Sequence, residues 1–213
     1  MVHAYGLAAA QLARIKEAGL NLTVCIDKVA ASGGYMMACV ADKILAAPFA
    51  VVGSIGVVAQ VPNFHDLLEK HDIDVEVFTA GKYKRTVTVF GENTEEDKQK
   101  FQQELEETHK LFKDFVRKYR PSLDVEQVAT GEHWYGEDAI TRNLVDALQT
   151  SDSYILEKMT DSELYAIQSR QKPTIAQKLG ISQAAQAVVA TAIDKLPDTL
   201  AKLESAKMPM VKK

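Results

Sequence analysis

The sequence predicts an α/β fold built of repeated βαβ units. Short apolar segments rich in β-branched residues alternate with segments of helical periodicity over most of the chain. This alternation is typical of parallel strands joined by right-handed crossover helices. With 213 residues, the chain has room for one sizeable domain and an appendage. We therefore expect a principal domain over residues 1–160 and a helical extension over residues 161–213.

The first elements place one strand directly before a glycine-rich turn. Residues 4–18 form a predicted helix with apolar side chains on one stripe. The segment NLTVCIDKV, residues 21–29, is a predicted buried strand, and a short helix is expected over residues 35–41. Further apolar segments predict strands over residues 42–48, 50–61 and 75–80. Because an α/β domain usually opens with a strand, we expect that N-terminal strands of the fold are missing from this chain.

The later elements are mainly helical. Thr94 and Asp97 form a predicted capping box at the start of a long helix that ends at about Arg120, before Pro121. Shorter helices are predicted over residues 62–70, 124–130 and 136–142. The segment after residue 160 is rich in Ala, Gln and Lys and has helical periodicity. It is interpreted as a loosely attached extension.

Composition excludes several classes of function. A formal net charge of −4 and dispersed basic residues give no reason to expect a nucleic-acid partner. Cys25 and Cys39 lack metal-ligand spacing, so they are expected to be reduced core thiols, and no metal or cofactor is expected. There is no apolar run long enough to span a bilayer and no secretory signal pattern at the start.

Ser32 stands at the turn between the first predicted strand and its helix, in the stretch KVAASGGYMMACVADKI. Such a turn directs the hydroxyl away from the sheet and places backbone N–H groups at the positive end of a helix. Gly33 and Gly34 would permit a positive φ and close approach of a substrate backbone. These features are typical of a nucleophile elbow, although the residues alone equally allow a helix N-cap or an anion-binding turn.

A nucleophilic serine needs a base, and the sequence offers two kinds. The five histidines, each expected to be a solvated surface residue, are His3, His65, His71, His109 and His133. Lysine serves as a base only when it is neutral, which requires burial or adjacent positive charge. Lys84 has Lys82 and Arg85 beside it, whereas the rival Lys28 is expected to point to solvent. The segment GKYKR could also be a plain exposed loop.

Four separate motifs together resemble the signal peptide peptidase A (protease IV) family. They are the stretch around Ser32, VVGSIGVV, FTAGKYKRTVTVF with NTEED, and GEHWYGEDAITRNLVDAL, in the family's order and spacing. The similarity is greatest to its short, SohB-type bacterial branch of inner-membrane proteases, and it covers roughly residues 1–150. The resemblance implies a Clp/crotonase-like serine peptidase domain.

The resemblance also implies roles for particular residues. Ser32 would be the nucleophile, Lys84 the general base and Gly33 an oxyanion donor. The segment expected to pair with an extended substrate consists of Gly53, Ser54, Ile55, Gly56 and Val57. Asn143 replaces the glycine of the family's usual GLVD motif, and asparagine tolerates the same helix end.

By this resemblance the protein is a serine endopeptidase with a Ser/Lys dyad. Its substrates would be membrane-derived or signal-peptide-like peptides. It would assemble as a homo-oligomer, and one form that the resemblance allows is a ring with the dyad at a subunit interface. An upstream anchor would hold it in the bacterial inner membrane, with the catalytic domain on the periplasmic side. A Gly-rich turn that supplies a second oxyanion donor is not found in this chain, so the fragment itself is expected to be weakly active or inactive.

Two other functions remain open at this point. One is a catalytically silent ring-forming scaffold that binds peptides by strand addition. The other is a crotonase-like acyl-CoA enzyme, which would not use a serine nucleophile.

Overall fold

The computed structural model describes residues 2–167, and most of the predicted C-terminal extension lies outside them. By its internal contacts the chain divides into residues 1–163 and residues 164–213. The helices are α1 (Val2–Glu17), α2 (Gly33–Ala38), α3 (His65–Glu69), α4 (Glu95–Tyr119), α5 (Val125–Val128), α6 (Gly136–Thr141) and α7 (Ser151–Lys158). The strands are β1 (Thr23–Ile26), β2 (Val29–Ala31), β3 (Lys43–Ala46), β4 (Val51–Gly53), β5 (His133–Tyr135) and β6 (Ala147–Leu148).

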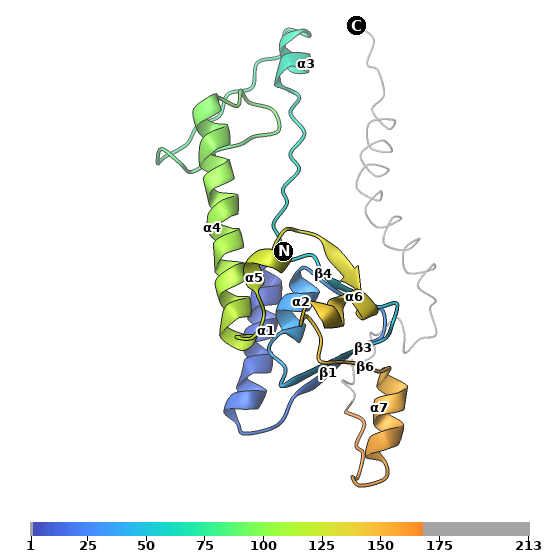
Figure 1. Ribbon diagram of the computed structural model, residues 1–213. Coiled ribbons are helices and arrows are strands. Elements are labelled where there is room, and N and C mark those ends of the chain that lie inside the picture. Colours follow the sequence, from blue (N-terminus) through green and yellow to red (C-terminus); the bar gives the residue numbers. More distant parts are fainter. Residues whose placement is uncertain (1, 168–213) are drawn as a thin grey trace, which may run out of the picture. The chain divides into compact units, whose positions relative to one another are not determined.

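The strands form two three-stranded sheets, in the orders β1-β3-β6 and β2-β4-β5 (Figure 1). Pairing is parallel in β1–β3, β2–β4 and β3–β6, with Cys25 opposite Leu45 and Ala31 opposite Gly53. Only β4–β5 is antiparallel among the described pairs. Parallel pairs need crossover connections, and α2 lies in the connection that leads from β1 to its partner β3. The predicted α/β class is confirmed.

One predicted strand divides between the two sheets. The segment 21–29 bends at Asp27 and Lys28, so β1 joins one sheet and β2 joins the other. The bend is held because the Asp27 carboxylate accepts hydrogen bonds from the backbone N–H and hydroxyl of Ser151. Ser32 therefore follows the short strand β2 rather than one continuous strand.

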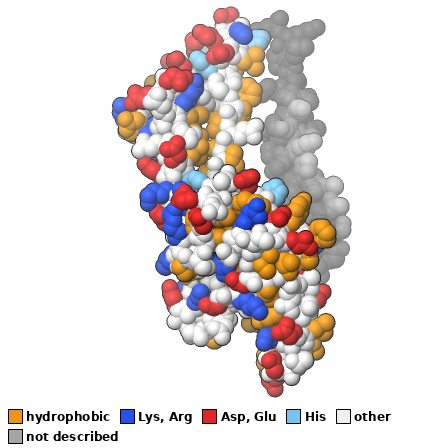
Figure 2. Space-filling view, viewed as in Figure 1, with side chains coloured by type: hydrophobic (Ala, Val, Ile, Leu, Met, Phe, Trp, Pro, Cys, Tyr) orange, Lys and Arg blue, Asp and Glu red, His pale blue; other side chains and the backbone are white. Residues whose placement is uncertain are grey.

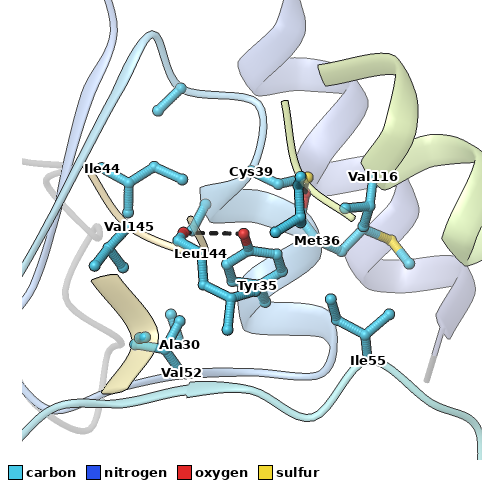
Figure 3. Packing of buried hydrophobic residues seen from close by; sticks show 14 of the residues in the cluster. Ala30, Tyr35, Met36, Cys39, Ile44, Val52, Ile55, Val116, Leu144 and Val145 are labelled. Carbon is cyan, nitrogen blue, oxygen red and sulfur yellow. Dashed lines mark hydrogen bonds between the residues drawn. The ribbon is translucent and has the colours of Figure 1, made fainter. Parts of the chain in front are cut away.

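The core surrounds helix α2, which contacts α1, β2 and α4 (Figure 3). Tyr35 is fully buried there, and its hydroxyl donates a hydrogen bond of 2.9 Å to the Leu144 carbonyl. Cys39 is buried beside it and unpaired, and burial raises the pKa of its thiol to about 12. Cys25 is partly buried and also free. The buried helix α2 thus fixes the position of the turn that precedes it.

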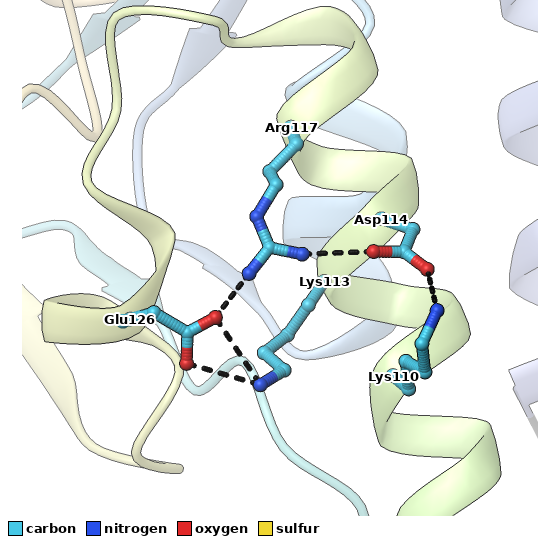
Figure 4. A network of polar contacts seen from close by, with 5 residues as sticks. All are labelled: Lys110, Lys113, Asp114, Arg117 and Glu126. Atoms are coloured by element: carbon cyan, nitrogen blue, oxygen red, sulfur yellow. Dashed lines mark hydrogen bonds and ion pairs between the residues drawn. The ribbon is translucent and has the colours of Figure 1, made fainter.

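Helix α4 begins at the predicted capping box and ends as predicted before Pro121. The Thr94 hydroxyl accepts from the Asp97 N–H, and the Asp97 carboxylate accepts from the Thr94 N–H. Near its other end, Lys113 and Arg117 contact Glu126 of α5 (Figure 4). Arg117 and Glu126 are exposed and Lys113 is only partly buried, so the ion pairs contribute little stability.

Arg120, at the end of α4, is the buried charged residue of the described core. Its guanidinium donates to both oxygens of Asp146 at 3.0 and 2.7 Å and to the Asn143 carbonyl at 3.1 Å. Asp146 also accepts a 2.6 Å hydrogen bond from the Ile44 N–H of β3. Burial raises the pKa of Asp146, but the hydrogen bonds from Arg120 and Ile44 outweigh it and leave that pKa below its usual value. The end of α4 is thereby attached to the sheet.

The prediction of a strand over residues 75–80 is wrong. This segment has no regular structure, and Val75, Val77 and Phe78 are exposed. Its β-branched composition favours a strand, but no neighbouring strand of the described chain pairs with it. Conversely, β5, β6 and α7 were not predicted. They are short or lack strong periodicity, so tertiary contacts rather than local pattern specify them.

The surface agrees with the charge analysis. Figure 2 shows acidic and basic side chains interspersed over the face in view, without a continuous basic patch. Among residues 2–167, no helix combines the length and apolar character needed to cross a bilayer.

Candidate active site

Ser32 adopts the backbone conformation of a sharp strand-to-helix bend. Its φ of 52° and ψ of −120° lie in a region that favours glycine. Two main-chain hydrogen bonds hold it there: its N–H donates to the Gly53 carbonyl of β4 at 2.7 Å, and its carbonyl accepts from the Met36 N–H at 3.0 Å. The positive φ occurs at the serine itself, and neither Gly33 nor Gly34 uses the positive φ that glycine would permit.

The Ser32 hydroxyl is not used as a helix cap. Ser32 occupies the N-cap position of α2, but its side chain makes no capping hydrogen bond. Ser32 is exposed and lines a pocket of about 630 Å³. The bend therefore presents the hydroxyl to a space that can hold another molecule.

The two glycines after Ser32 have different surroundings. A β-carbon at Gly33 would lie 2.2 Å from ring atoms of Tyr5 on α1, whereas one at Gly34 would meet nothing within 4 Å. The expectation that both glycines admit a substrate backbone is therefore wrong for Gly33, because the Tyr5 ring already occupies that space. The Gly33 N–H is in the first turn of α2 and has no acceptor within the helix, so it remains suited to binding an oxyanion.

The predicted substrate segment, residues 53–57, is partly engaged within the chain. Gly53 lies in β4 between β2 and β5, the Ser54 N–H donates to Glu132, and the Ile55 carbonyl accepts from Gly131. Ile55 is buried. Ser54, Gly56, Val57 and Val58 line the Ser32 pocket, and Val58 is almost fully exposed. Free main-chain groups for a substrate are thus to be sought at residues 56–58.

Lys84 lies outside the Ser32 pocket in a single chain. Residues 81–85 form an exposed turn in which the Lys84 N–H donates to the Gly81 carbonyl at 3.1 Å. Lys84 is not among the residues that line the pocket. Tyr83 beside it is itself half exposed, so it does not shield Lys84 from water. The structure therefore does not bring the two predicted dyad residues together within one copy.

The neighbouring lysines differ from Lys84 in their partners. Lys82 forms a 2.7 Å ion pair with Glu96, and the hydrogen bond that its ammonium donates to the Glu96 carboxylate raises the Lys82 pKa above its ordinary value. A lysine held in its protonated form is a poor base. Lys28 is exposed at the bend between β1 and β2 and does not line the pocket. The Lys82 ion pair favours Lys84 over Lys82, whereas exposure and distance from the pocket do not distinguish Lys84 from Lys28.

One histidine lines the pocket, which sequence reasoning missed. His109 of α4 is partly buried and shares the pocket with Ser32. The signal was present: His109 precedes Phe112 and Val116, the buried residues of α4, by three and seven positions and so belongs to the same helical stripe. His3, His71 and His133 are exposed, as predicted.

A second group of side chains gathers on α3. Potential ligand atoms of His65, Asp66 and Glu69 lie within 4.8 Å of one another. None of the three lines the Ser32 pocket. Exposed groups of this kind are common on protein surfaces without an ion, and the cluster has no geometric link to the serine.

Comparison with known proteins assigns the chain to a family. Residues 14–165, most of the described chain, match the family of peptidases designated S49. The chain belongs to peptidase family S49. Its relatives include a "Probable protease SohB" from Haemophilus influenzae, 64% identical over 180 residues that cover 84% of this chain and 51% of the relative.

Other relatives of the S49 chain show the same partial coverage. A "Probable protease SohB" from Buchnera aphidicola subsp. Acyrthosiphon pisum is 57% identical over 168 residues, covering 79% of this chain and 50% of the relative. The chain thus spans about half the length of the curated relatives it matches. The expected family, including its SohB-type branch, is confirmed.

Among solved structures, an enoyl-CoA hydratase/isomerase from Marinobacter aquaeolei aligns with 98% of this chain and 60% of its own. The TM-score is 0.41 and the identity 13%. A hydratase/racemase from Magnetospirillum magneticum gives a TM-score of 0.37 at 14% identity, covering 95% of this chain and 56% of its own. Likeness at this level supports no conclusion about acyl-CoA chemistry. The parallel strand pairing agrees with the expected α/β class, and the Clp/crotonase-like fold remains what the family resemblance implies.

Proposed function

We propose that the protein is a serine endopeptidase in which Ser32 is the nucleophile and Lys84 of a neighbouring copy is the general base. The observation that carries the proposal is the Ser32 bend: in a chain of a peptidase family, a serine at positive φ presents an uncapped hydroxyl to a roomy pocket. Strained backbone of this kind is concentrated at functional sites.

The base is assigned to a neighbouring copy because Lys84 does not line the Ser32 pocket of its own chain. Lys84 is on an exposed turn, whereas a lysine acts as a base only where burial or adjacent positive charge favours its neutral form. Contact with a second copy would remove water from that turn. The exposed apolar side chains Tyr83 and Phe78 beside it, and Val58 at the pocket, are suited to burial in such a contact.

The reaction would proceed through an acyl-enzyme. Neutral Lys84 removes the proton from Ser32 Oγ, which attacks the substrate carbonyl carbon, and the Gly33 N–H binds the resulting oxyanion. Protonated Lys84 then transfers its proton to the leaving amine as the peptide bond breaks. In the second half, Lys84 takes a proton from water, the hydroxide attacks the ester, and the proton returns to Ser32.

The proposed substrates are membrane-derived or signal-peptide-like peptides, bound in extended form beside residues 56–58. The proposed location is the bacterial inner membrane, with this domain on the periplasmic side and an anchor elsewhere in the protein. These assignments rest on the family resemblance and are not required by the dyad chemistry.

The test uses the full-length protein with the segment that precedes this chain. We expect Ser32→Ala and Lys84→Ala to abolish peptide hydrolysis and labelling by a fluorophosphonate, and Lys82→Ala to retain most of both. Activity that survives Lys84→Ala but not Lys82→Ala would show that Lys82, and not Lys84, is the general base. Peptide binding without turnover by the unmodified protein would support the scaffold alternative.

Mixing variants tests the shared site directly. Subunits that carry Ser32→Ala and subunits that carry Lys84→Ala should each be inactive, yet partial activity should return when the two exchange into one oligomer. Mixtures that form oligomers but stay inactive would contradict a dyad shared between copies. The control is a mixture of two different variants of the same residue, which cannot restore a shared site and should stay inactive.

A further inference from the structure

The sheet β2-β4-β5 has an apolar outer face that is open in the part of the chain that the structure describes. Alternate residues of a strand point to opposite faces of a sheet. The inner row packs in or against the core and consists of Ala30, Val52 and Trp134. The outer row, whose members lie opposite one another across the three strands, consists of Val29, Val51 and Tyr135. Val29 is 65% exposed and Tyr135 is 52% exposed, so this apolar row is in contact with solvent.

An open apolar face of this kind is expected to bind another surface. Parallel strand pairs such as β2–β4 occur almost entirely in sheets that are covered on both faces. Phe49, two residues before Val51, is 86% exposed and extends the apolar surface beyond the start of β4. Contiguous exposed apolar surfaces mark interaction sites. We refer to Val29, Phe49, Val51 and Tyr135 as the outer sheet face.

The outer sheet face leads to the Ser32 pocket. Ala31 points to the same side of β2 as Val29, and it lines this pocket. Ser32 follows Val29 by three residues, which correspond to about 10 Å along an extended chain. A molecule bound on the outer sheet face is therefore within reach of the serine.

The turn that carries Lys84 belongs to a segment with matching apolar character. Residues 73–85 are exposed throughout. Phe78 is 86% exposed and Tyr83 is 49% exposed, and both lie close to Lys84 in the sequence. A surface that buried these two aromatic rings would also remove water from the lysine, and burial is one of the conditions under which a lysine acts as a base.

The charges beside the two surfaces are complementary. Glu137 and Asp138 immediately follow Tyr135, and Arg85 immediately follows Lys84. All four charged side chains are exposed, and in the part of the chain that the structure describes none of them has an ion-pair partner. Attraction between the two cations and the two carboxylates would guide residues 73–85 of another molecule onto the outer sheet face.

We propose that residues 73–85 of a second copy dock on the outer sheet face and thereby bring Lys84 to Ser32. This inference rests on the proposed dyad and adds the two surfaces through which the copies meet. Because the two surfaces differ, the contact is heterologous. Each copy offers one segment and one face, so that copies assemble into a ring or an open chain.

The experiment disables one surface at a time in the full-length protein. Tyr135→Asp changes the outer sheet face, and Phe78→Asp changes the docking segment. Each variant alone should associate at least about 10-fold more weakly in analytical ultracentrifugation, and its peptide hydrolysis should fall with the loss of association. Leu156→Asp, at an exposed leucine of α7, is the matched control and should alter neither quantity.

A mixture of the two variants tests whether the two surfaces bind each other. The Tyr135→Asp copy keeps an intact segment and the Phe78→Asp copy keeps an intact face, so the mixture should form pairs and regain activity. Lys84→Ala added to the Phe78→Asp copy, together with Ser32→Ala added to the Tyr135→Asp copy, should leave this activity in place. The reverse placement should abolish the activity while pairs still form.

Cysteine cross-linking gives a second measurement with milder substitutions. Phe49 and Phe78 are each 86% exposed, so their replacement by cysteine should not disturb folding. With a short bismaleimide linker, copies that carry Phe49→Cys should cross-link to copies that carry Phe78→Cys, whereas copies that carry Leu156→Cys should not. This measurement also decides the question if an aspartate variant fails to fold.

Two results would overturn the inference. One is that both aspartate variants remain oligomeric and that no cross-link joins residue 49 to residue 78. The other is a monomeric unmodified protein in which Tyr135→Asp lowers the urea midpoint of unfolding, because another part of the full-length chain then covers the outer sheet face. If the unmodified protein hydrolyses no peptide, the proposed function fails, but loss of association in both variants and its return in the mixture would still support the docking surfaces.

Discussion

Replacement of Ser32 by glycine should stabilise the protein while it removes the nucleophile. A non-glycine residue at the φ and ψ of Ser32 carries strain of about 1–3 kcal/mol. Glycine releases this strain but costs about 0.5–1 kcal/mol in additional unfolded-state entropy. The Ser32 hydroxyl makes no capping bond whose loss would offset the gain. The expected net stabilisation is about 1 kcal/mol.

The reference protein for this measurement is Ser32→Ala. Alanine keeps the β-carbon and hence the strain, and both variants lack the nucleophile, so self-digestion affects neither. In urea unfolding of the full chain, Ser32→Gly should be more stable than Ser32→Ala by about 1 kcal/mol, and its melting temperature should rise by about 2–4 °C. Ser122, an exposed serine without a positive φ, supplies the matched control. Ser122→Gly should destabilise by about 0.5–1 kcal/mol.

The outcome that would refute this reasoning is simple to recognise. If Ser32→Gly is no more stable than Ser32→Ala, the bend is not strained, and backbone strain at Ser32 no longer supports a functional role for this residue.

Three further predictions concern the surroundings of the site. Gly33→Ala should destabilise the protein by about 1–3 kcal/mol in urea unfolding, because the Tyr5 ring occupies the space that the new β-carbon would need. Adding Tyr5→Ala should reduce that cost. Gly34→Ala, which meets nothing, should be neutral or stabilising by up to about 1 kcal/mol. A similar loss for both glycine variants would contradict the Tyr5 contact. Arg120→Met should cost about 3 kcal/mol, since it leaves the carboxylate of Asp146 partly buried without its partner, and a loss below 1 kcal/mol would show that the pair is unimportant. Because the pKa of Asp146 is lowered in the folded state, its stabilisation should be complete above about pH 5 and disappear as the pH falls below about 4, and Asp146→Asn should flatten the dependence of unfolding free energy on pH in that range.

Local patterns predicted the elements whose signals lie within a few neighbouring residues. The capping box at Thr94, the stop before Pro121 and the helix after Ser32 each depend on short-range chemistry, and each is present. The apolar segments of β1 and β3 likewise carry their own burial signal. These features could be predicted because they do not depend on distant parts of the chain.

Features that depend on distant contacts were missed. The segment 75–80 has strand composition without a partner, and β6 is a strand only because it pairs with β3. The contact between Tyr5 and Gly33 joins two helices and leaves no local trace. The position of His109 on the buried stripe of α4 was readable, but a lone histidine on a charged helix was interpreted as a surface residue.

The site itself was predicted in part. Ser32 was singled out through its motif, and the structure places it at a pocket, while its role as the nucleophile stays a prediction. The role of Lys84 stays a prediction, because its distance from a serine of another copy depends on an assembly that one sequence does not describe.

The Tyr5 contact has a consequence for control of the enzyme. Since the first helix rests its aromatic ring on the residue whose N–H would receive the oxyanion, any force that shifts this helix is transmitted directly to the reaction centre. If Gly33 has the proposed role, an antibody fragment or a designed protein that binds the exposed side of α1 should therefore inhibit turnover at a distance, leaving the Ser32 pocket open while it displaces the Gly33 amide.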